Sequence, residues 1–197
     1  MTDERLLNRA SRGDEAAFLL LYERHRDAVF RFAYRLLGSV GLAEDVTHDC
    51  FLSLLRQPAK FDSTRASLRT YLLAATRNLS LKHFRRTGGE VLAEELTDEL
   101  RMPEGAEPLR QLLDAELSSE VQRAIESLPP LQREALVLFE FEELPLADIA
   151  DVVGADVGAV KARLHRARQR LKVVLAPYMN SSSSSKRVVV EEAFNER

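Results

Sequence analysis

The strongest candidate for chemistry is a run of cations in the segment PLADIADVVGADVGAVKARLHRARQRLK. Its spacing predicts two helices joined by a tight turn, with Ala150 at the crossing, Gly154 in the turn and Val160 locking the second helix. Residues 156–178 carry six basic side chains and one acidic side chain. A helix that packs across a partner and is basic on its exposed side can enter the major groove of DNA. We therefore expect a DNA-binding helix-turn-helix here, in preference to a solvated basic helix in a bundle.

Apolar and charged positions of the second helix fall on different faces. A buried stripe is expected at Val157, Val160, Leu164, Ala167 and Leu171. Residues near the start of such a helix reach base edges, whereas later ones reach phosphates. The candidates for base contacts are Lys161, Ala162, His165 and Arg166. The candidates for phosphate contacts or local packing are Arg163, Arg168 and Lys172.

The distribution of charge supports nucleic-acid binding although the net charge of the chain is −3. Residues 1–88 and 156–178 each carry a net charge of +5, whereas 89–127 carry −8 and 128–155 carry −5. Because the Debye length is about 8 Å at physiological salt, each block acts through its own local field. The two basic blocks can therefore contact DNA despite the acidic ones.

Helical periodicity runs through almost the whole chain, so we expect an all-α fold. The predicted helices are 29–37, 42–57, 66–86, 112–128, 131–141, 146–153 and 156–175. Glycine, proline and acidic residues interrupt the pattern at 89–115, which predicts a flexible acidic linker between two small helical domains at 1–88 and 116–178. The serine-rich end at 179–197 is expected to be a flexible tail, or alternatively an extra regulatory contact through its apolar residues.

Both halves of the chain resemble one known family. LPPLQRE, ADIA and VKARLHRAR in the second half resemble region 4 of the extracytoplasmic-function sigma factors, the smallest group of the sigma-70 superfamily. In the first half, AEDVTHDCFL resembles region 2.2, and SLRTYLLAATRNLSLKHFRR resembles regions 2.3 and 2.4. The resemblance covers roughly residues 12–87 and 116–175, and the order and spacing of both halves make it specific.

The resemblance implies roles for residues of the first half. The positions that match the segment docking on core RNA polymerase are Glu44, Asp45, Asp49 and Phe51. The positions that match those melting and recognising the promoter −10 element are Arg69, Tyr71, Arg77, Asn78, Lys82, Arg85 and Arg86. That task needs cations for phosphates and aromatic or polar groups for an unstacked base. The second-half recognition helix would bind the −35 element.

Some positions depart from the family or allow a simpler interpretation. Tyr71 stands where the family often has tryptophan, and Thr47 and His48 occupy a place where glutamine is common. Glu44 and Asp45 could also serve as first-turn residues that complement a helix dipole. Asn78 is the best candidate for a base contact on the −10 element, and its alternative is an ordinary surface asparagine.

Other chemistries have no support in the sequence. Cys50 is the only cysteine, which excludes an internal disulfide and a cysteine-rich zinc site. The four histidines lack partners at ligand spacing, and no phosphate-binding loop or zinc-protease motif is present. We therefore expect no enzyme, no cofactor and no metal. The charged N-terminus and the lack of a long apolar run predict a cytoplasmic protein without membrane insertion.

The leading hypothesis is thus an alternative sigma factor whose partners are core RNA polymerase, promoter DNA and, by resemblance, an anti-sigma factor. One alternative is a helix-turn-helix transcriptional regulator that acts without core polymerase. The basic helix at 66–86 would have no function in such a regulator. A second alternative is a helical adaptor or anti-sigma protein, which would not need a recognition helix bearing six cations.

Overall fold

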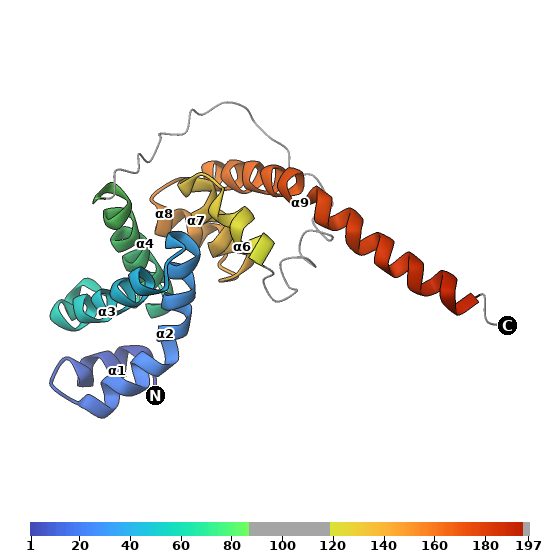
Figure 1. The fold of residues 1–197 in the computed structure, drawn as a ribbon. Helices are drawn as coiled ribbons and strands as arrows, with labels where there is room; N and C mark the ends of the chain where they lie inside the picture. The colour runs from blue at the N-terminus through green and yellow to red at the C-terminus, as the bar shows by residue number, and fades with distance from the viewer. Residues whose placement is uncertain (87–118, 195–197) are drawn as a thin grey trace.

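The computed structural model describes the backbone of residues 1–86 and 119–194, and side chains up to Arg85 and from Glu120 to Ala176. Within these ranges every regular element is helical, which confirms the predicted all-α fold (Figure 1). The elements are α1 (Asp3–Ala10), α2 (Glu15–Leu37), α3 (Val40–Arg56), η1 (Pro58–Lys60), α4 (Leu68–Arg86), α6 (Ser119–Glu126), α7 (Pro130–Glu140), α8 (Leu146–Val153) and α9 (Val157–Phe194). We call α1–α4 the first domain and α6–α9 the second domain.

Local signals start and stop the helices of the first domain. The side chain of Asp14 accepts a hydrogen bond from the backbone N–H of Ala17 at 3.0 Å and so caps α2. Gly38 ends the same helix in the left-handed region, at φ 66°. Helix α2 begins well before the predicted 29–37, and α1 was not predicted. Both are held by a core in which Phe51 packs edge-on against Tyr22 at 4.8 Å between ring centroids.

The second domain contains the predicted helix-turn-helix in α8 and α9. Gly154 adopts the left-handed region at φ 65° and ends α8, as its place in the turn predicts. Ala150 is buried at the crossing, and Val160 is fully buried. Leu164, Ala167 and Leu171 complete the buried stripe, each with no exposed surface. Val157 was predicted to join them but is 36% exposed, because it is the first residue of α9 and lies at the edge of the packed face.

The two domains pack against each other through a shared apolar core, which the sequence did not predict. Phe32, Leu36 and Leu73 of the first domain belong to the same buried cluster as the interior of the second domain. Arg133 of α7 crosses this interface and donates a hydrogen bond to the carbonyl oxygen of Leu36 at 2.6 Å. Arg35 of α2 lies over the ring of Phe141, 4.2 Å from its centroid. Figure 1 shows α2 and α4 beside the helices of the second domain.

Helix α9 is much longer than predicted, because it continues through the serine run to Phe194 and projects away from both domains (Figure 1). The flexible tail expected at 179–197 stays a prediction, while the backbone of residues 179–194 continues the helix. Pro177 lies inside α9, where it removes one i→i−4 hydrogen bond, and neither glycine nor proline follows it. The predicted linker at 89–115 lies outside the described residues.

Candidate nucleic-acid and polymerase interfaces

The start of α9 presents the predicted base-contacting residues. The side chain of Asp156 accepts a hydrogen bond from the backbone N–H of Ala159 at 2.9 Å, which orders the first turn of the helix. Lys161 is exposed, whereas Ala162, His165 and Arg166 are half-buried. Lys172 is exposed two turns beyond Arg166 and can reach a phosphate.

Two cations of the recognition helix face inward. Arg163 Nη1 lies 3.5 Å from Glu134 Oε1, and the Arg163 side chain is only 14% exposed. Arg168 pairs with Glu140 through Nε at 3.0 Å and lies over the ring of Phe139 at 5.2 Å. The structure thus assigns Arg163 and Arg168 to local packing, one of the two roles that the sequence left open for them.

Helix α4 carries the residues predicted for the −10 element, and the structure divides them into two groups. Asn78, Lys82 and Arg85 are exposed on its later turns. Arg69 and Arg77, on its earlier turns, are engaged by carboxylates of the second domain. The side chain of Arg86 lies outside the described residues.

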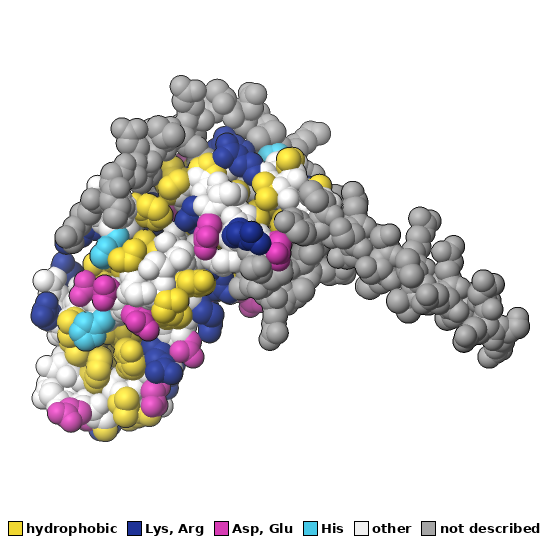
Figure 2. All heavy atoms as spheres, in the orientation of Figure 1, with side chains coloured by type: hydrophobic (Ala, Val, Ile, Leu, Met, Phe, Trp, Pro, Cys, Tyr) yellow, Lys and Arg dark blue, Asp and Glu magenta, His cyan; other side chains and the backbone are white. Residues whose placement is uncertain are grey.

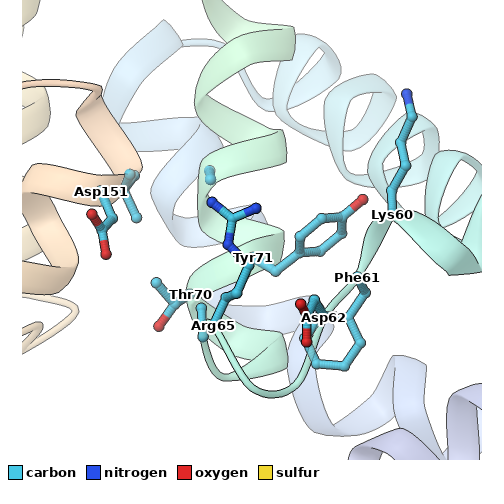
Figure 3. Close-up of a pocket in the computed structure, with 10 residues that line it drawn as sticks. Lys60, Phe61, Asp62, Arg65, Thr70, Tyr71 and Asp151 are labelled. Carbon is cyan, nitrogen blue, oxygen red and sulfur yellow. The ribbon is translucent and has the colours of Figure 1, made fainter.

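A cavity of about 340 Å³ opens beside Tyr71, between the α3–α4 connection and α8 (Figure 3). Phe61 and Tyr71 meet in its wall with ring centroids 5.6 Å apart and ring planes at 63°. Lys60 and Arg65 supply cations at its rim, and Asp151 of α8 faces it from the second domain. Burial raises the pKa of the Tyr71 hydroxyl, so the ring stays neutral.

Sequence reasoning missed all of these cavity residues except Tyr71. The available signal was the stretch KFDSTR, in which an aromatic residue lies between cations a few positions before Tyr71. The helix periodicity places that stretch only in the gap between the predicted helices 42–57 and 66–86.

The predicted polymerase-docking residues lie on α3. Glu44, Asp45 and Asp49 are exposed, so each carboxylate is available to a partner. Phe51, by contrast, is 2% exposed and packs against Phe18 and Tyr22. The prediction of direct contact by Phe51 is therefore wrong, because on α3 this position faces α2; its burial instead holds the acidic helix in place.

A second cavity, of about 300 Å³, adjoins the acidic positions of α3. It is lined by residues of α2 and α3, among them Tyr22, Arg26, Phe30 and His48, which sequence reasoning did not assign to docking. Figure 2 shows acidic and histidine side chains beside exposed hydrophobic ones on this part of the first domain. The surface is therefore mixed in character, as expected for a site that binds another protein reversibly.

Two general properties limit the chemistry of the described residues. They contain no group of three or more histidine, cysteine, aspartate or glutamate side chains that could hold a metal ion. None of their helices combines the length and apolarity needed to cross a bilayer.

Comparison with known proteins identifies the family. A model of Sigma-70 region 2 matches residues 21–90, and a model of Sigma-70 region 4 matches residues 118–171. The chain is 35% identical to the ECF RNA polymerase sigma factor SigE of Mycolicibacterium smegmatis, over 88% of this chain and 68% of that relative. The chain belongs to the ECF sigma factors of the sigma-70 family. The predicted family and its role in promoter-specific transcription initiation are confirmed.

Further relatives agree with this assignment. The ECF sigma factor is 28% identical to SigW of Bacillus subtilis, over 87% of this chain and 96% of that relative. It is 29% identical to the sigma-E factor of Escherichia coli, over 90% of this chain and 96% of that relative.

Two solved structures share its fold. The sigma factor RpoE in complex with the anti-sigma factor NepR from Bartonella quintana matches with a TM-score of 0.62, at 25% identity, over 81% of this chain and 96% of that one. CnrH in complex with the cytosolic domain of CnrY matches with a TM-score of 0.64, at 23% identity, over 89% of this chain and 97% of that one.

Proposed function

We propose that this ECF sigma factor works in the cytoplasm, where it binds core RNA polymerase and directs it to promoters through two DNA-binding domains. Residues 1–88 would dock on polymerase and open the −10 element, 89–115 would act as a tether, and 116–178 would bind the −35 element. The observation that carries the proposal is the helix-turn-helix of α8 and α9, with its glycine turn and its exposed cations. When polymerase holds the two tethered domains at the spacing of the −35 and −10 elements, two weak DNA contacts combine into a higher affinity for the promoter.

Recognition of the −35 element rests on the first turns of α9. Lys161 and Arg166 can donate to guanine O6 and N7, and Ala162 can contact a thymine methyl group. Lys172 is placed to hold a phosphate and so to fix the register of the helix on the duplex.

Recognition of the −10 element rests on α4 and on the cavity beside Tyr71. An unstacked base needs an aromatic face for stacking and nearby cations for its phosphates. The Phe61–Tyr71 pair supplies the aromatic wall, and Lys60 and Arg65 supply positive charge at the rim. Asn78 on the exposed face of α4 is the proposed hydrogen-bonding partner of a base.

Docking on core polymerase is assigned to the acidic face of α3, through Glu44, Asp45 and Asp49. Because the similar chain RpoE was solved with an anti-sigma factor, we also propose a protein inhibitor of that class for this chain. Such an inhibitor would cover the surfaces that polymerase needs.

In vitro transcription with purified core polymerase and a pool of genomic promoter fragments tests the proposal. Start sites that require both polymerase and this protein are expected, and Arg166→Glu should abolish them by reversing charge on the recognition helix. Arg123→Glu is the matched control, because Arg123 is 69% exposed and pairs with Glu120 of its own helix α6, and this change should leave the start sites intact. If no start site forms while the protein alone shifts duplex DNA, a helix-turn-helix regulator acting without polymerase replaces the sigma factor.

A further inference from the structure

The loop that joins η1 to α4 carries an acidic residue where DNA is proposed to bind. Asp62 lies in the sequence between the half-buried ring of Phe61 and the exposed cation of Arg65. All three residues line the cavity beside Tyr71 (Figure 3). A carboxylate near a nucleotide repels its phosphates, because the two groups carry like charges. The place of Asp62 in the cavity wall therefore needs a reason other than attraction to DNA.

The Asp62 carboxylate is bound within its own loop. Its Oδ1 accepts hydrogen bonds from the backbone N–H of Thr64 at 2.9 Å and from the Thr64 hydroxyl at 2.7 Å. These two hydrogen bonds lower the pKa of Asp62, the hydroxyl more than the N–H, so the side chain stays an ionised acceptor at neutral pH. Asp62 thus forms a side-chain turn, in which a carboxylate bonds to the backbone two residues further on.

The backbone of the same residue closes the loop. The carbonyl oxygen of Asp62 accepts hydrogen bonds from the N–H of Arg65 at 3.1 Å and from the N–H of Ala66 at 3.4 Å. Ser67 then caps α4, because its hydroxyl accepts a hydrogen bond from the backbone N–H of Thr70 at 3.1 Å. Asp62 therefore fixes the path of the chain from η1 into α4.

The cavity depends on the shape of this loop. Phe61, at the start of the loop, meets Tyr71 with ring centroids 5.6 Å apart. Stacking on aromatic rings tolerates every base, so discrimination between bases must come from the shape of the pocket and from polar groups at its rim. Residues 62–65 are all exposed, so buried apolar surface does not hold them in place. Their arrangement depends instead on the hydrogen bonds to Asp62.

We propose that Asp62 is a positioning residue for base selection at the −10 element. Its carboxylate holds the loop in the shape that places Phe61 and Arg65 at the cavity, and it does not itself bind the base. The inference rests on the proposed function, because it takes the cavity beside Tyr71 as the place where an unstacked base binds.

In vitro transcription by the complete polymerase holoenzyme tests the proposal on promoters that carry each base in turn at every position of the −10 element. The yield ratio of the best base to the poorest base measures discrimination at each position. Asp62→Ala should lower the largest ratio about 2- to 10-fold, the effect of one net hydrogen bond. Asp62→Asn should keep the ratio of the parent, because an amide oxygen can accept the same two hydrogen bonds from Thr64.

Two further variants separate positioning from a general loss of stability. Thr64→Val removes the hydroxyl and keeps the N–H, so it should lower the ratio by less than Asp62→Ala, and the double variant should lose no more than Asp62→Ala alone. Asp14→Ala is the matched control, because Asp14 also accepts a backbone hydrogen bond, from Ala17 at 3.0 Å, but lies outside the cavity. It should leave the ratio unchanged. Far-UV circular dichroism establishes that each variant is folded.

The outcomes separate the inference from the proposed function. If Asp62→Asn prefers a different base, or loses as much discrimination as Asp62→Ala, the carboxylate itself acts on the base and the positioning role is overturned. A parent-like ratio for Asp62→Ala overturns it too, as does a uniform rise in yield for both variants, which loss of repulsion would cause. Failure of the proposed function would instead appear as the absence of start sites for the parent chain on every promoter.

Discussion

Replacing Gly154 by alanine tests whether the turn before the recognition helix depends on a left-handed backbone. Gly154 has φ 65°, and a Cβ added there would meet no heavy atom within 4 Å. Gly41 in α3 is the matched comparison: it is also exposed and also has free space at the Cβ position, but it has no positive φ. Only the backbone conformation therefore distinguishes the two substitutions.

The two changes should have opposite signs. A left-handed conformation costs a non-glycine residue about 1–2 kcal/mol, whereas losing glycine restricts the unfolded chain and returns about 0.4–1 kcal/mol. Gly154→Ala should thus lower the free energy of unfolding by up to about 1.6 kcal/mol, as the difference of these two effects. Gly41→Ala should raise the free energy of unfolding by up to about 1 kcal/mol, because it has no left-handed strain.

Urea unfolding followed by circular dichroism measures both effects, with equal m-values showing that only stability has changed. Gly154→Asn should recover part of the loss, because asparagine tolerates the left-handed region better than alanine does. If the urea midpoints of Gly154→Ala and Gly41→Ala shift in the same direction, the turn does not depend on the left-handed backbone of Gly154, and the reasoning is refuted.

Three further predictions concern DNA binding and pH. Asn78→Ala should reduce promoter opening about 10- to 100-fold in a permanganate footprint while −35 duplex binding stays unchanged, since one base contact is lost. Lys172→Ala should lower the slope of log affinity against log salt by about 1 in a −35 binding titration, and an unchanged slope would remove it from the phosphate contacts. Burial raises the pKa of Glu142 above its ordinary 4.5 although Arg69, Arg31 and Arg35 oppose the shift. The Glu142 carboxyl group therefore binds its proton more tightly in the folded state than in the unfolded state. As the pH rises from about 4.5, the free energy of unfolding measured by urea titration should fall. The variant Glu142→Gln should lack this pH dependence.

Much of the candidate site was predictable because its signals are local. The glycine turn, the buried stripe of α9 and the exposed cations around it all follow from residues within a few turns of each other. Val157 was the local error, because it sits at a helix end, where periodicity says little about burial.

The contacts across the two domains were decided by tertiary structure alone. Arg77 and its partner Glu134 are 57 residues apart, and Arg69 and Glu142 are 73 apart, so no spacing rule could pair them. Likewise, Phe51 shares α3 with exposed acidic residues, and only the packing of α2 beside it places its ring in the core.

The amino-acid sequence by itself determined the helical fold, the position of the helix-turn-helix and the set of basic residues able to meet DNA, because helix periodicity and turn chemistry depend on near neighbours. Tertiary structure decided which of those cations are free and which are held. Lys82 and Arg85 point to solvent, whereas Arg69 and Arg77 lie against a second domain that burial of apolar surface brings into place. Whether an arginine can reach DNA depends on that packing, because the packing decides which carboxylates of distant helices lie beside it.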